Sequence, residues 1–288
     1  MPQSDNQSQT SLNTPIVLTI AGSDSGGGAG IQADIKAISA TGGYACSVIT
    51  AITSQNTQGV SAILPVPVEH VESQLDAVFS DLDIVAVKIG MLADSHIIAA
   101  VGRKLRQYQP RFVVLDPVMV ATSGDLLLQS AAIDSLKQEL LPLATLITPN
   151  LPEAAALTGL PACEQESQLE VMSEALRALP CKAVLLKGGH LAGTSHSDDW
   201  LLSGADTVAF RAQRVDTQNT HGTGCTLSSA IASYLAQGFA LQDAIRHAKY
   251  YISQAIAHAD ELSIGRGHGP VHHFFALSPI FSSSQESL

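Results

Sequence analysis

The sequence predicts an α/β fold in which a mainly parallel sheet is covered by helices on both faces. Hydrophobic residues make up 45% of the 288 positions and charged residues only 14%, which suits a buried sheet and argues against a disordered chain. Short β-branched runs alternate with longer helical patterns, and this βαβ rhythm is typical of parallel strands joined by right-handed crossovers. The runs are apolar almost throughout, as expected of strands that are buried on both faces.

The expected elements follow one another along the chain. Strands are expected at 16–21, 47–53, 84–89, 112–116, 143–148 and 183–187, and helices at 29–41, 68–80, 95–108, 131–140 and 169–178. A further helix is expected after Asn150, with Glu153 in its first turn. Beyond Lys187 the rhythm changes, and the remaining pattern predicts a hairpin of 198–202 with 207–211 around Ser203-Gly204, then two closing helices near 222–237 and 241–259.

One domain is expected over residues 15–277, because no internal repeat or linker-like change of composition interrupts the pattern. The polar segment 1–14 and the Ser-rich segment 278–288 are expected to be flexible tails. The first tail lacks the basic start and apolar core of a secretion signal. No apolar run approaches the roughly 20 residues that span a membrane, so neither a signal nor a membrane partner is expected.

Charge and cysteine content narrow the class of protein further. The formal net charge is −11 and no Lys/Arg cluster occurs, so no nucleic-acid partner is expected. A nucleotide ligand stays possible, because phosphates are held by local backbone N–H groups, a few cations and Mg²⁺. The four cysteines show no CxxC pairing, which argues against a disulfide framework or a zinc site and favours a reducing, cytoplasmic location; they are Cys46, Cys163, Cys181 and Cys225.

Polar and glycine-rich residues follow the expected strands at the ends where each strand finishes. They are the loop 22–30, Asp116, Asn150 and the pair Gly188-Gly189. In parallel sheets, ligands bind at the carboxyl ends of the strands. These residues are therefore expected to gather along one edge of the sheet.

The segment 219–225, Asn-Thr-His-Gly-Thr-Gly-Cys, opens the first closing helix. Gly222 and Gly224 allow a tight turn that brings consecutive N–H groups together, and the helix adds the positive end of its dipole. This arrangement suits the charge of a transferring phosphoryl group. An ordinary glycine-rich turn into a packed helix is the alternative interpretation, and a lone GxG does not decide between them.

Asn150 ends a strand and Glu153 follows three residues later. The carboxylate of Glu153 reaches the same cavity and is a candidate for holding Mg²⁺, directly or through water. The same spacing is that of a capping box, with Asn at the N-cap and Glu at N3, so plain helix capping is the alternative.

Lys187 and Asp116 also lie at strand ends. Lys187, before two glycines, can extend its ammonium along a nucleotide's phosphates, or it can simply reach from the sheet rim into a turn. Asp116, before Pro117, is either a magnesium ligand through water or a strand-end cap. The loop 22–30 satisfies a dinucleotide pattern only because it is so rich in glycine, and the chain has no Gly-Lys-Ser/Thr of a Walker loop.

The order of these elements resembles that of ribokinase-like kinases, with NxxE and the Gly-x-Gly anion hole as shared features. The finer resemblance is to the hydroxymethylpyrimidine kinase family and covers about residues 15–275. It rests on Ala-Gly-Ser-Asp (21–24), Gly-Ala-Gly-Ile-Gln-Ala-Asp (28–34), Ser-Val-Ile-Thr-Ala (47–51), Gln-Asn-Thr (55–57), Lys-Ile-Gly-Met (88–91), Thr-Pro-Asn-Leu-Pro-Glu (148–153), Lys-Gly-Gly-His (187–190), Asn-Thr-His-Gly-Thr-Gly-Cys (219–225) and Gly-Pro-Val-His-His (269–273).

One departure from the family concerns the first loop. The family usually has Asp-Pro-Ser-Gly-Gly-Ala-Gly, whereas this chain has Asp24-Ser25-Gly26 before the same Gly-Gly-Ala-Gly. Replacing Pro-Ser by Ser-Gly is expected to loosen the loop.

The resemblance implies that ATP phosphorylates the hydroxymethyl group of 4-amino-5-hydroxymethyl-2-methylpyrimidine, and then its monophosphate in the same site, and that the protein is a homodimer. Gln55 matches the glutamine that recognises the pyrimidine, and its amide can pair with the aminopyrimidine edge. The other residues that the resemblance implies are Gly22 and Met91 beside the ring, Lys187, Asn150 and Thr220 at the nucleotide, and Glu153 and Asp116 at Mg²⁺. Met91 could equally be a core residue.

Cys225 stands where the wider superfamily has an aspartate base. A thiol at a helix N-terminus is expected to have a lowered pKa, so Cys225 is predicted to accept the substrate proton. A weaker role is also compatible, because phosphoryl transfer depends chiefly on positioning and charge stabilisation. Two other functions stay open at this point, a pyridoxal kinase and a non-catalytic nucleotide or pyrimidine sensor. Asp116, Glu153, Lys187 and the anion hole argue against the sensor.

Overall fold

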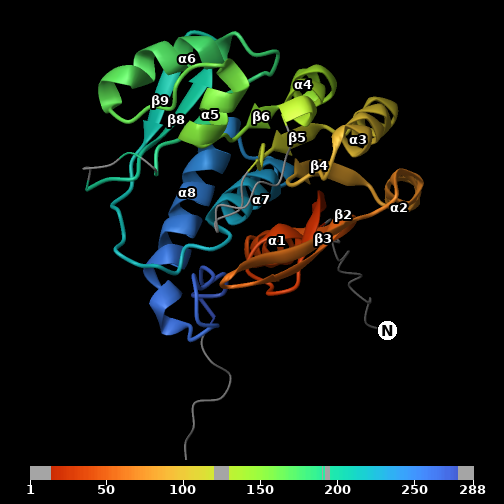
Figure 1. Cartoon of the computed structure of the whole chain (residues 1–288), viewed down its shortest axis with the longest axis horizontal. Helices are drawn as coiled ribbons and strands as arrows, with labels where there is room; N and C mark the ends of the chain where they lie inside the picture. The colour runs from red at the N-terminus through yellow and green to blue at the C-terminus, as the bar shows by residue number, and fades with distance from the viewer. Residues whose placement is uncertain (1–13, 120–129, 190, 192–194, 278–288) are drawn as a thin grey trace, which may run out of the picture.

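The computed structural model describes residues 14–119, 130–189, 191 and 195–277 (Figure 1). The predictions for the segments 1–13 and 278–288, and for His190, fall outside these residues. Within them, nine strands form one sheet in the order β3-β2-β1-β4-β5-β6-β7-β8-β9. The strands are β1 (Ile16–Asp24), β2 (Tyr44–Asn56), β3 (Gly59–Pro65), β4 (Ile84–Ile89), β5 (Phe112–Leu115), β6 (Leu146–Ile147), β7 (Val184–Lys187), β8 (Asp199–Ser203) and β9 (Asp206–Phe210).

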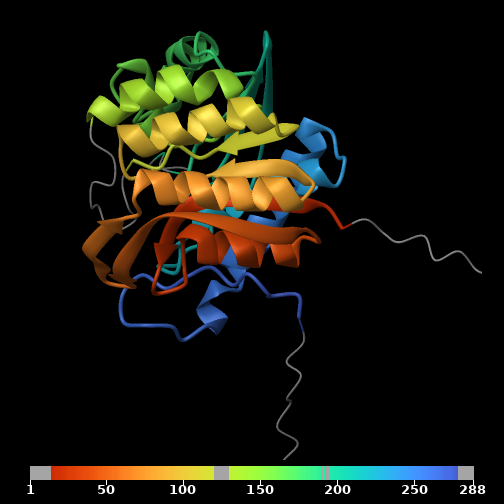
Figure 2. The same cartoon turned by 90° about the vertical axis from the view of Figure 1, so that its right-hand side faces the viewer.

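Helices cover both faces of the sheet, as the sequence predicts. They are α1 (Gly30–Ala40), α2 (Val68–Asp81), α3 (Ser95–Tyr108), α4 (Ser130–Glu139), α5 (Leu151–Thr158), α6 (Leu169–Arg177), α7 (Thr223–Ala236) and α8 (Leu241–Ala257), with short 3-10 turns at Leu141–Leu143, Glu166–Gln168 and Ala259–Glu261. One face carries α2 to α6, of which α2, α3 and α4 lie side by side in Figure 2. The other face carries α1, α7 and α8.

The pairing of the strands confirms the mainly parallel sheet. β2, β1, β4, β5, β6 and β7 pair in parallel, and β8 and β9 add the predicted antiparallel hairpin. Side chains alternate between two cores along each central strand. Leu18 and Ile20 pack toward α2–α6, whereas Val17 packs toward α1, α7 and α8. Burial on both faces is the reason why these strands are apolar almost throughout.

Two details differ from the sequence prediction. β2 runs to Asn56 and turns back into β3, an antiparallel edge strand that was not predicted. Most of β3 is exposed, so it lacks the continuous apolar run of the buried strands. The strand expected at 143–148 shrinks to β6, because the 3-10 turn Leu141–Leu143, with Pro142 in it, takes up Leu143. The remaining expected elements begin and end within a few residues of the observed ones.

Among the helices that the structure describes, none has both the length and the apolar character needed to cross a bilayer.

Candidate active site

A cavity of about 810 Å³ opens along the carboxyl edge of the parallel strands. It is lined by the ends of β1, β2, β4 and β7, by the segment after β5 and by the start of α7. All of the site residues predicted from the sequence border it, namely Gly22, Gln55, Met91, Asp116, Asn150, Glu153, Lys187, Thr220, Gly222, Gly224 and Cys225. The structure therefore brings them together as predicted, although their individual roles do not follow from this placement alone.

The start of α7 is built as a turn that only glycine can make. Gly222 has a φ of 83°, and a Cβ on it would lie 1.9 Å from the Gly28 carbonyl oxygen. The first loop and the α7 loop are thus in direct contact. The Thr223 hydroxyl donates to the Thr220 carbonyl over 2.7 Å and braces the turn. The first-turn N–H groups of a helix have no acceptors within the helix, so this end of α7 is suited to bind an anion.

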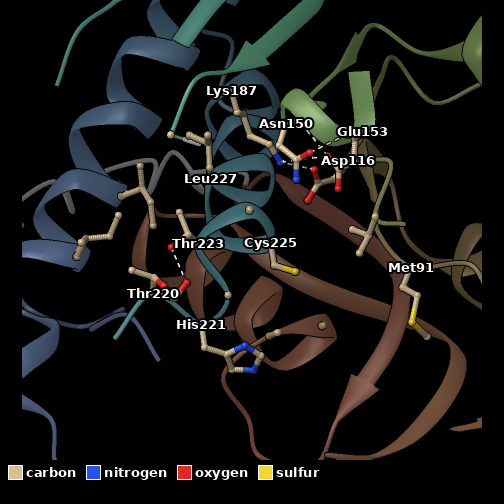
Figure 3. Close-up of a pocket in the computed structure, with 18 of the residues that line it drawn as sticks. Met91, Asp116, Asn150, Glu153, Lys187, Thr220, His221, Thr223, Cys225 and Leu227 are labelled. Atoms are coloured by element: carbon tan, nitrogen blue, oxygen red, sulfur yellow. Dashed lines mark hydrogen bonds and ion pairs between the residues drawn. The ribbon is translucent and has the colours of Figure 1, made fainter. Parts of the chain in front are cut away.

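Three charged side chains form a cluster on the nucleotide side of the predicted site (Figure 3). The Lys187 ammonium lies 2.8 Å from Asp116 Oδ1 and 3.9 Å from Glu153 Oε2, and the Thr148 hydroxyl donates to Asp116 Oδ1 over 2.9 Å. A Cβ on Gly224 would lie 3.3 Å from both Asp116 Oδ2 and Lys187 Nζ. The cluster therefore adjoins the anion-binding start of α7.

The ionisation of the two carboxyl groups differs although both are buried. Burial alone would raise the pKa of Asp116, but the Lys187 and Lys88 ammonium groups outweigh it and hold that pKa below its usual value. Burial raises the pKa of Glu153 to about 7 against the opposing effect of Lys187, and the Asp116 carboxylate adds to the rise. A cation bound beside such a carboxyl would offset the cost of ionising it.

Asn150 and Glu153 form the capping box that was the alternative interpretation. The Asn150 side chain accepts from the Glu153 N–H, and the Glu153 carboxylate accepts from the Asn150 N–H, each over 2.8 Å. Capping is therefore a real role of this pair. It uses Oε2 of Glu153, and the residue also borders the cavity, so capping and metal binding are compatible.

Gln55, Gly22 and Met91 lie at the other end of the cavity. A Cβ on Gly22 would lie 2.6 Å from the Met91 methyl carbon, so glycine leaves room for that side chain beside the sheet. The Gln55 amide nitrogen lies 3.4 Å from His221 Nε2, and its amide oxygen accepts from the Thr53 hydroxyl over 3.2 Å. In Figure 3 the Cys225 side chain points from the first turn of α7 toward the side that Met91 borders.

The first loop is fastened to β2 through Ser25, and the expectation that Ser25 and Gly26 loosen it stays a prediction. The Ser25 hydroxyl donates to the Gln55 carbonyl oxygen over 2.7 Å and accepts from the Gln55 N–H over 2.8 Å. A Cβ on Gly26 would lie 3.3 Å from Asn56 Cα, so glycine permits this close approach. A proline in place of Ser25 has no hydroxyl and makes neither bond.

Asp24 and His221 join the first loop to the α7 loop, and sequence reasoning assigned them no role. The Asp24 carboxylate accepts the N–H groups of Gly26, Gly28 and Ala29, and its Oδ2 lies 3.0 Å from His221 Nε2. Burial opposes ionisation, but the hydrogen bonds from His221 and the backbone outweigh it and lower the pKa of Asp24. The signal was present in Ala-Gly-Ser-Asp and Asn-Thr-His-Gly, but only the fold shows that these motifs meet.

The pKa of Cys225 moves opposite to the sequence prediction. Burial raises the pKa of its thiol to about 11, and the Lys88 ammonium and the Gly30 N–H only partly offset this. The expected lowering by the helix N-terminus was wrong, because it neglected the loss of water around the sulfur and the carboxylates of Asp34 and Asp116. At neutral pH the thiol is therefore protonated in this structure.

Two further lysines border the cavity. Lys88, from the Lys-Ile-Gly-Met motif, pairs with Asp34, and both side chains have no exposed surface. Lys249 of α8 lies 2.6 Å from Asp199 Oδ2 and donates to the Ser197 carbonyl. Lys249 lies in an ordinary amphipathic helix, so nothing in the sequence marked it.

Comparisons with known proteins place this chain among small-molecule kinases. The family model described as phosphomethylpyrimidine kinase matches residues 24–272. A hydroxymethylpyrimidine/phosphomethylpyrimidine kinase of Rhizobium meliloti is 55% identical over 261 residues, which is 91% of this chain and 97% of the relative. The relative from Escherichia coli with the same name is 51% identical over 259 residues, covering 90% of this chain and 97% of its own.

Two solved structures share the fold. The phosphomethylpyrimidine kinase of Clostridium difficile 630 has a TM-score of 0.74 and 44% identity, covering 84% of this chain and 99% of its own. The pyridoxal kinase of Bacillus subtilis, solved as an ADP complex, has a TM-score of 0.83 and 33% identity, covering 90% and 97%.

The contact between Asp24 and the loop backbone generates a prediction about stability. Asp24→Asn removes the charge that accepts three N–H groups and faces His221, so it should lower the free energy of unfolding by about 1–3 kcal/mol at neutral pH. Folding lowers the pKa of Asp24 below its ordinary value of 3.8, so this contribution is present above that value and lost as pH falls through the folded pKa. Urea unfolding should show a gap between wild type and variant that is steady at pH 5–7 and shrinks below about pH 4.

Asp94→Asn is the matched control, because Asp94 also accepts backbone N–H groups at a helix start but does not face another loop. A gap for Asp24→Asn no larger than that for Asp94→Asn would contradict the importance of the loop contact.

Proposed function

The chain belongs to the phosphomethylpyrimidine kinase family, and from this membership we propose how its site phosphorylates 4-amino-5-hydroxymethyl-2-methylpyrimidine and then its monophosphate with ATP. One observation carries the proposal. The start of α7, where Cys225 lies, is between the Lys187–Asp116–Glu153 cluster and Met91 (Figure 3), and Gln55 borders the same cavity. A phosphoryl donor and a pyrimidine therefore fit on opposite sides of the same helix start.

Lys187, Asn150 and Thr220 serve the nucleotide in this proposal. The Lys187 ammonium is already beside the α7 start, and a small movement away from Asp116 would turn it toward the phosphates. Asn150 and Thr220 also border the cavity. The N–H groups around Gly222 and Gly224 stabilise the negative charge of the phosphoryl group during its transfer.

Asp116 and Glu153 fit the role of holding Mg²⁺. Both are carboxylates, the ligand type that Mg²⁺ prefers. Burial and the neighbouring Asp116 carboxylate raise the pKa of Glu153, and a cation bound between the two would offset this cost of ionising it. When bound, the ion would offset the charge of the ATP phosphates. Lys187 keeps Asp116 ionised, and Asn150 fixes the Glu153 side chain through the capping box.

Gln55 reads the pyrimidine, with Gly22 and Met91 beside the ring. The Gln55 amide carries donors and acceptors that match an aminopyrimidine edge. Its backbone is fixed by Ser25 and its side chain is oriented by Thr53 and His221. The apolar Met91 side chain and the bare backbone at Gly22 allow a flat ring to approach closely.

Cys225 contacts the reacting hydroxyl in this proposal, and its main contribution is to position that group. A thiol with a pKa of about 11 is a poor proton acceptor at neutral pH. In a loose phosphoryl transfer, the hydroxyl proton needs no early removal, so charge stabilisation at the α7 start provides most of the rate.

Product analysis tests the function. Incubation with Mg-ATP and the hydroxymethylpyrimidine should give the monophosphate first and the diphosphate later, with ADP released at each step. Pyridoxal belongs in the same assay, because the pyridoxal kinase neighbour shares the fold with a TM-score of 0.83. Faster phosphorylation of pyridoxal than of the pyrimidine, or ADP release without phosphorylated product, would contradict the proposal.

A homodimer is also proposed. β3 is an edge strand, and Leu64 on it lies opposite Ile52 of β2, with exposed fractions of 65% and 51%. Apolar side chains beside a strand edge are typical of a surface covered by a partner, and a second copy of the chain supplies the same edge. Light scattering should give a mass near twice 30.1 kDa.

Leu64→Lys should shift that mass toward a single chain, because it places a charge in the covered surface. Val171→Lys on α6 is the control, since Val171 is equally exposed but lies far along the sheet from β3. A single-chain mass for the wild type at micromolar concentration would contradict the dimer.

A cytoplasmic location is proposed as well, because the four cysteines, all within the described residues, are free thiols. Recovery of the protein outside the cytoplasmic fraction of its cells would contradict this.

Gln55→Ala tests the recognition of the pyrimidine. Loss of the amide should weaken binding of the pyrimidine by about 1–3 kcal/mol and leave the affinity for ATP nearly unchanged. Ser25→Ala should produce a smaller loss of about 0.5–1.5 kcal/mol, because it removes the bonds that fix the Gln55 backbone. Calorimetric titration of each ligand separates the two affinities.

Ser61→Ala is the matched control, because the Ser61 hydroxyl donates to the Ser54 carbonyl of β2 but has no part in the first loop. Equal losses for ATP and pyrimidine would indicate a folding defect instead of a recognition defect.

Glu153→Gln tests the magnesium proposal. Glutamine preserves the capping geometry but removes the charge, so kcat should fall about tenfold or more and the Mg²⁺ concentration for half-maximal activity should rise. Thermal stability should stay close to wild type, because ionising Glu153 is already unfavourable in the folded protein. Glu170→Gln, in the exposed first turn of α6, is the control and should change neither property. A loss of stability with unaltered magnesium dependence would leave capping as the only role of Glu153.

A further inference from the structure

A buried ionic cluster lies beneath the start of α7. The Lys88 ammonium of β4 lies 2.8 and 2.9 Å from the two oxygens of Asp34 in α1. The Thr19 hydroxyl of β1 donates to Asp34 Oδ2 over 2.6 Å, and the Ser229 hydroxyl of α7 donates to Oδ1 over 2.7 Å. Lys88 and Asp34 have no exposed surface, so the whole cluster is shielded from water.

The helical members of this cluster, Asp34 and Ser229, lie about one turn beyond the starts of α1 and α7, which meet at the site. Ser229 follows Cys225 by four residues in α7, and Asp34 follows Gly30 by four residues in α1, so each pair shares a helix face. The Gly30 N–H bonds to the Cys225 sulfur. The cluster therefore connects the helix that carries Cys225 to the loop that carries Asp24.

The Lys88 ammonium reaches the floor of the cavity from below. Lys88 borders the cavity although it is fully buried, and a Cβ on Gly90 would lie 2.7 Å from its Nζ, so glycine leaves room for the ammonium. An ammonium has three N–H donors, of which the carboxylate of Asp34 takes two. The Lys88 ammonium therefore contacts both Asp34 and the cavity.

If the contact between Lys88 and Asp34 only held β4 and α1 together, it would not need charged side chains. Burying two ions costs free energy through desolvation, and well-packed apolar residues of similar volume often serve as well or better. The Lys88 ammonium, however, borders the cavity and acts electrostatically on Cys225 and Asp116, and a fixed buried charge acts strongly on groups near it.

We propose that Lys88 is a positioning residue of the reaction centre, whose ammonium, held by Asp34, stabilises negative charge at Cys225 and on the phosphoryl group bound over the start of α7. The Asp34 carboxylate offsets part of the electrostatic effect of Lys88 at the site, so the ion pair determines how strong that effect is. The expected effect on kcat rests on the proposed function, whereas the expected effect on the Cys225 thiol does not.

The ionisation of the Cys225 thiol reports on the charge of Lys88 and Asp34. The charged groups that act on its thiol are Lys88 of β4, Asp34 of α1, Asp116 after β5 and Lys187 of β7. Lys88 favours the thiolate and Asp34 opposes it, with Lys88 having the larger effect. Changes at the two residues should therefore shift the thiol in opposite directions.

The test is the pH dependence of Cys225 alkylation by iodoacetamide, followed by mass spectrometry of the peptide that contains it, with no nucleotide or substrate present. Asp34→Asn leaves the Lys88 charge less compensated, so the alkylation midpoint should fall by about one pH unit, which is about tenfold faster reaction near neutral pH. Lys88→Met combined with Asp34→Asn removes both charges with similar volume, so the midpoint should rise above the wild-type value. Ser229→Ala is the matched control, because it removes one bond to Asp34 without changing any charge and should lower thermal stability but leave the midpoint in place.

The kinetic arm uses the same proteins. The Lys88→Met/Asp34→Asn variant should lose about tenfold or more in kcat, with the KM for ATP within about twofold of wild type, because the charge acts on the transition state. If the folded double variant keeps the wild-type midpoint, the inference is overturned, and this comparison decides even if Asp34→Asn alone does not fold. A shifted midpoint with unaltered kcat would also overturn the kinetic part. Absence of kinase activity in the wild type would instead count against the proposed function.

Discussion

The buried ion pair between Asp34 and Lys88 is the interaction on which the rest of the structure depends. It joins β1, α1, β4 and α7 at one point, because Thr19 and Ser229 donate to the same carboxylate. Two unexposed charges are tolerated only when each finds its partner, so the ion pair favours this arrangement of the four elements. That arrangement brings the starts of α1 and α7 together at the edge of the sheet, where the loops that line the cavity come from.

The proposed site explains how an acidic protein would bind phosphate. The net charge of −11 would play no direct part, because the proposed binding groups are the N–H groups at a helix start and Lys187, which is held by Asp116. Asp116 keeps Lys187 charged beside the cavity, as Asp34 does for Lys88. The first loop adds no cation, and Asp24 fixes its backbone against His221. Local geometry, more than overall charge, therefore makes this edge suitable for a nucleotide.

The sequence predicted the sheet, its helices and the gathering of the site residues, because buried parallel strands are continuously apolar and polar residues mark their ends. It missed β3, whose exposed side chains carry no such pattern. The predicted direction of the Cys225 pKa shift was wrong, because the sequence indicates that Cys225 lies at a helix start but does not indicate how deeply its thiol is buried. The bonds of Ser25 to Gln55 and of Asp24 to His221 join residues 30 and 197 positions apart, and no local spacing could indicate them.

The central claim is that donor and acceptor meet over the start of α7 in one cavity. A crystal structure with a non-hydrolysable ATP analogue and the hydroxymethylpyrimidine tests it most directly. The account predicts the terminal phosphate within hydrogen-bonding distance of the N–H groups of Gly224 and Cys225, and the pyrimidine on Gln55 with its hydroxymethyl group toward that phosphate. A terminal phosphate bound away from α7, or a pyrimidine bound outside the cavity, would contradict it.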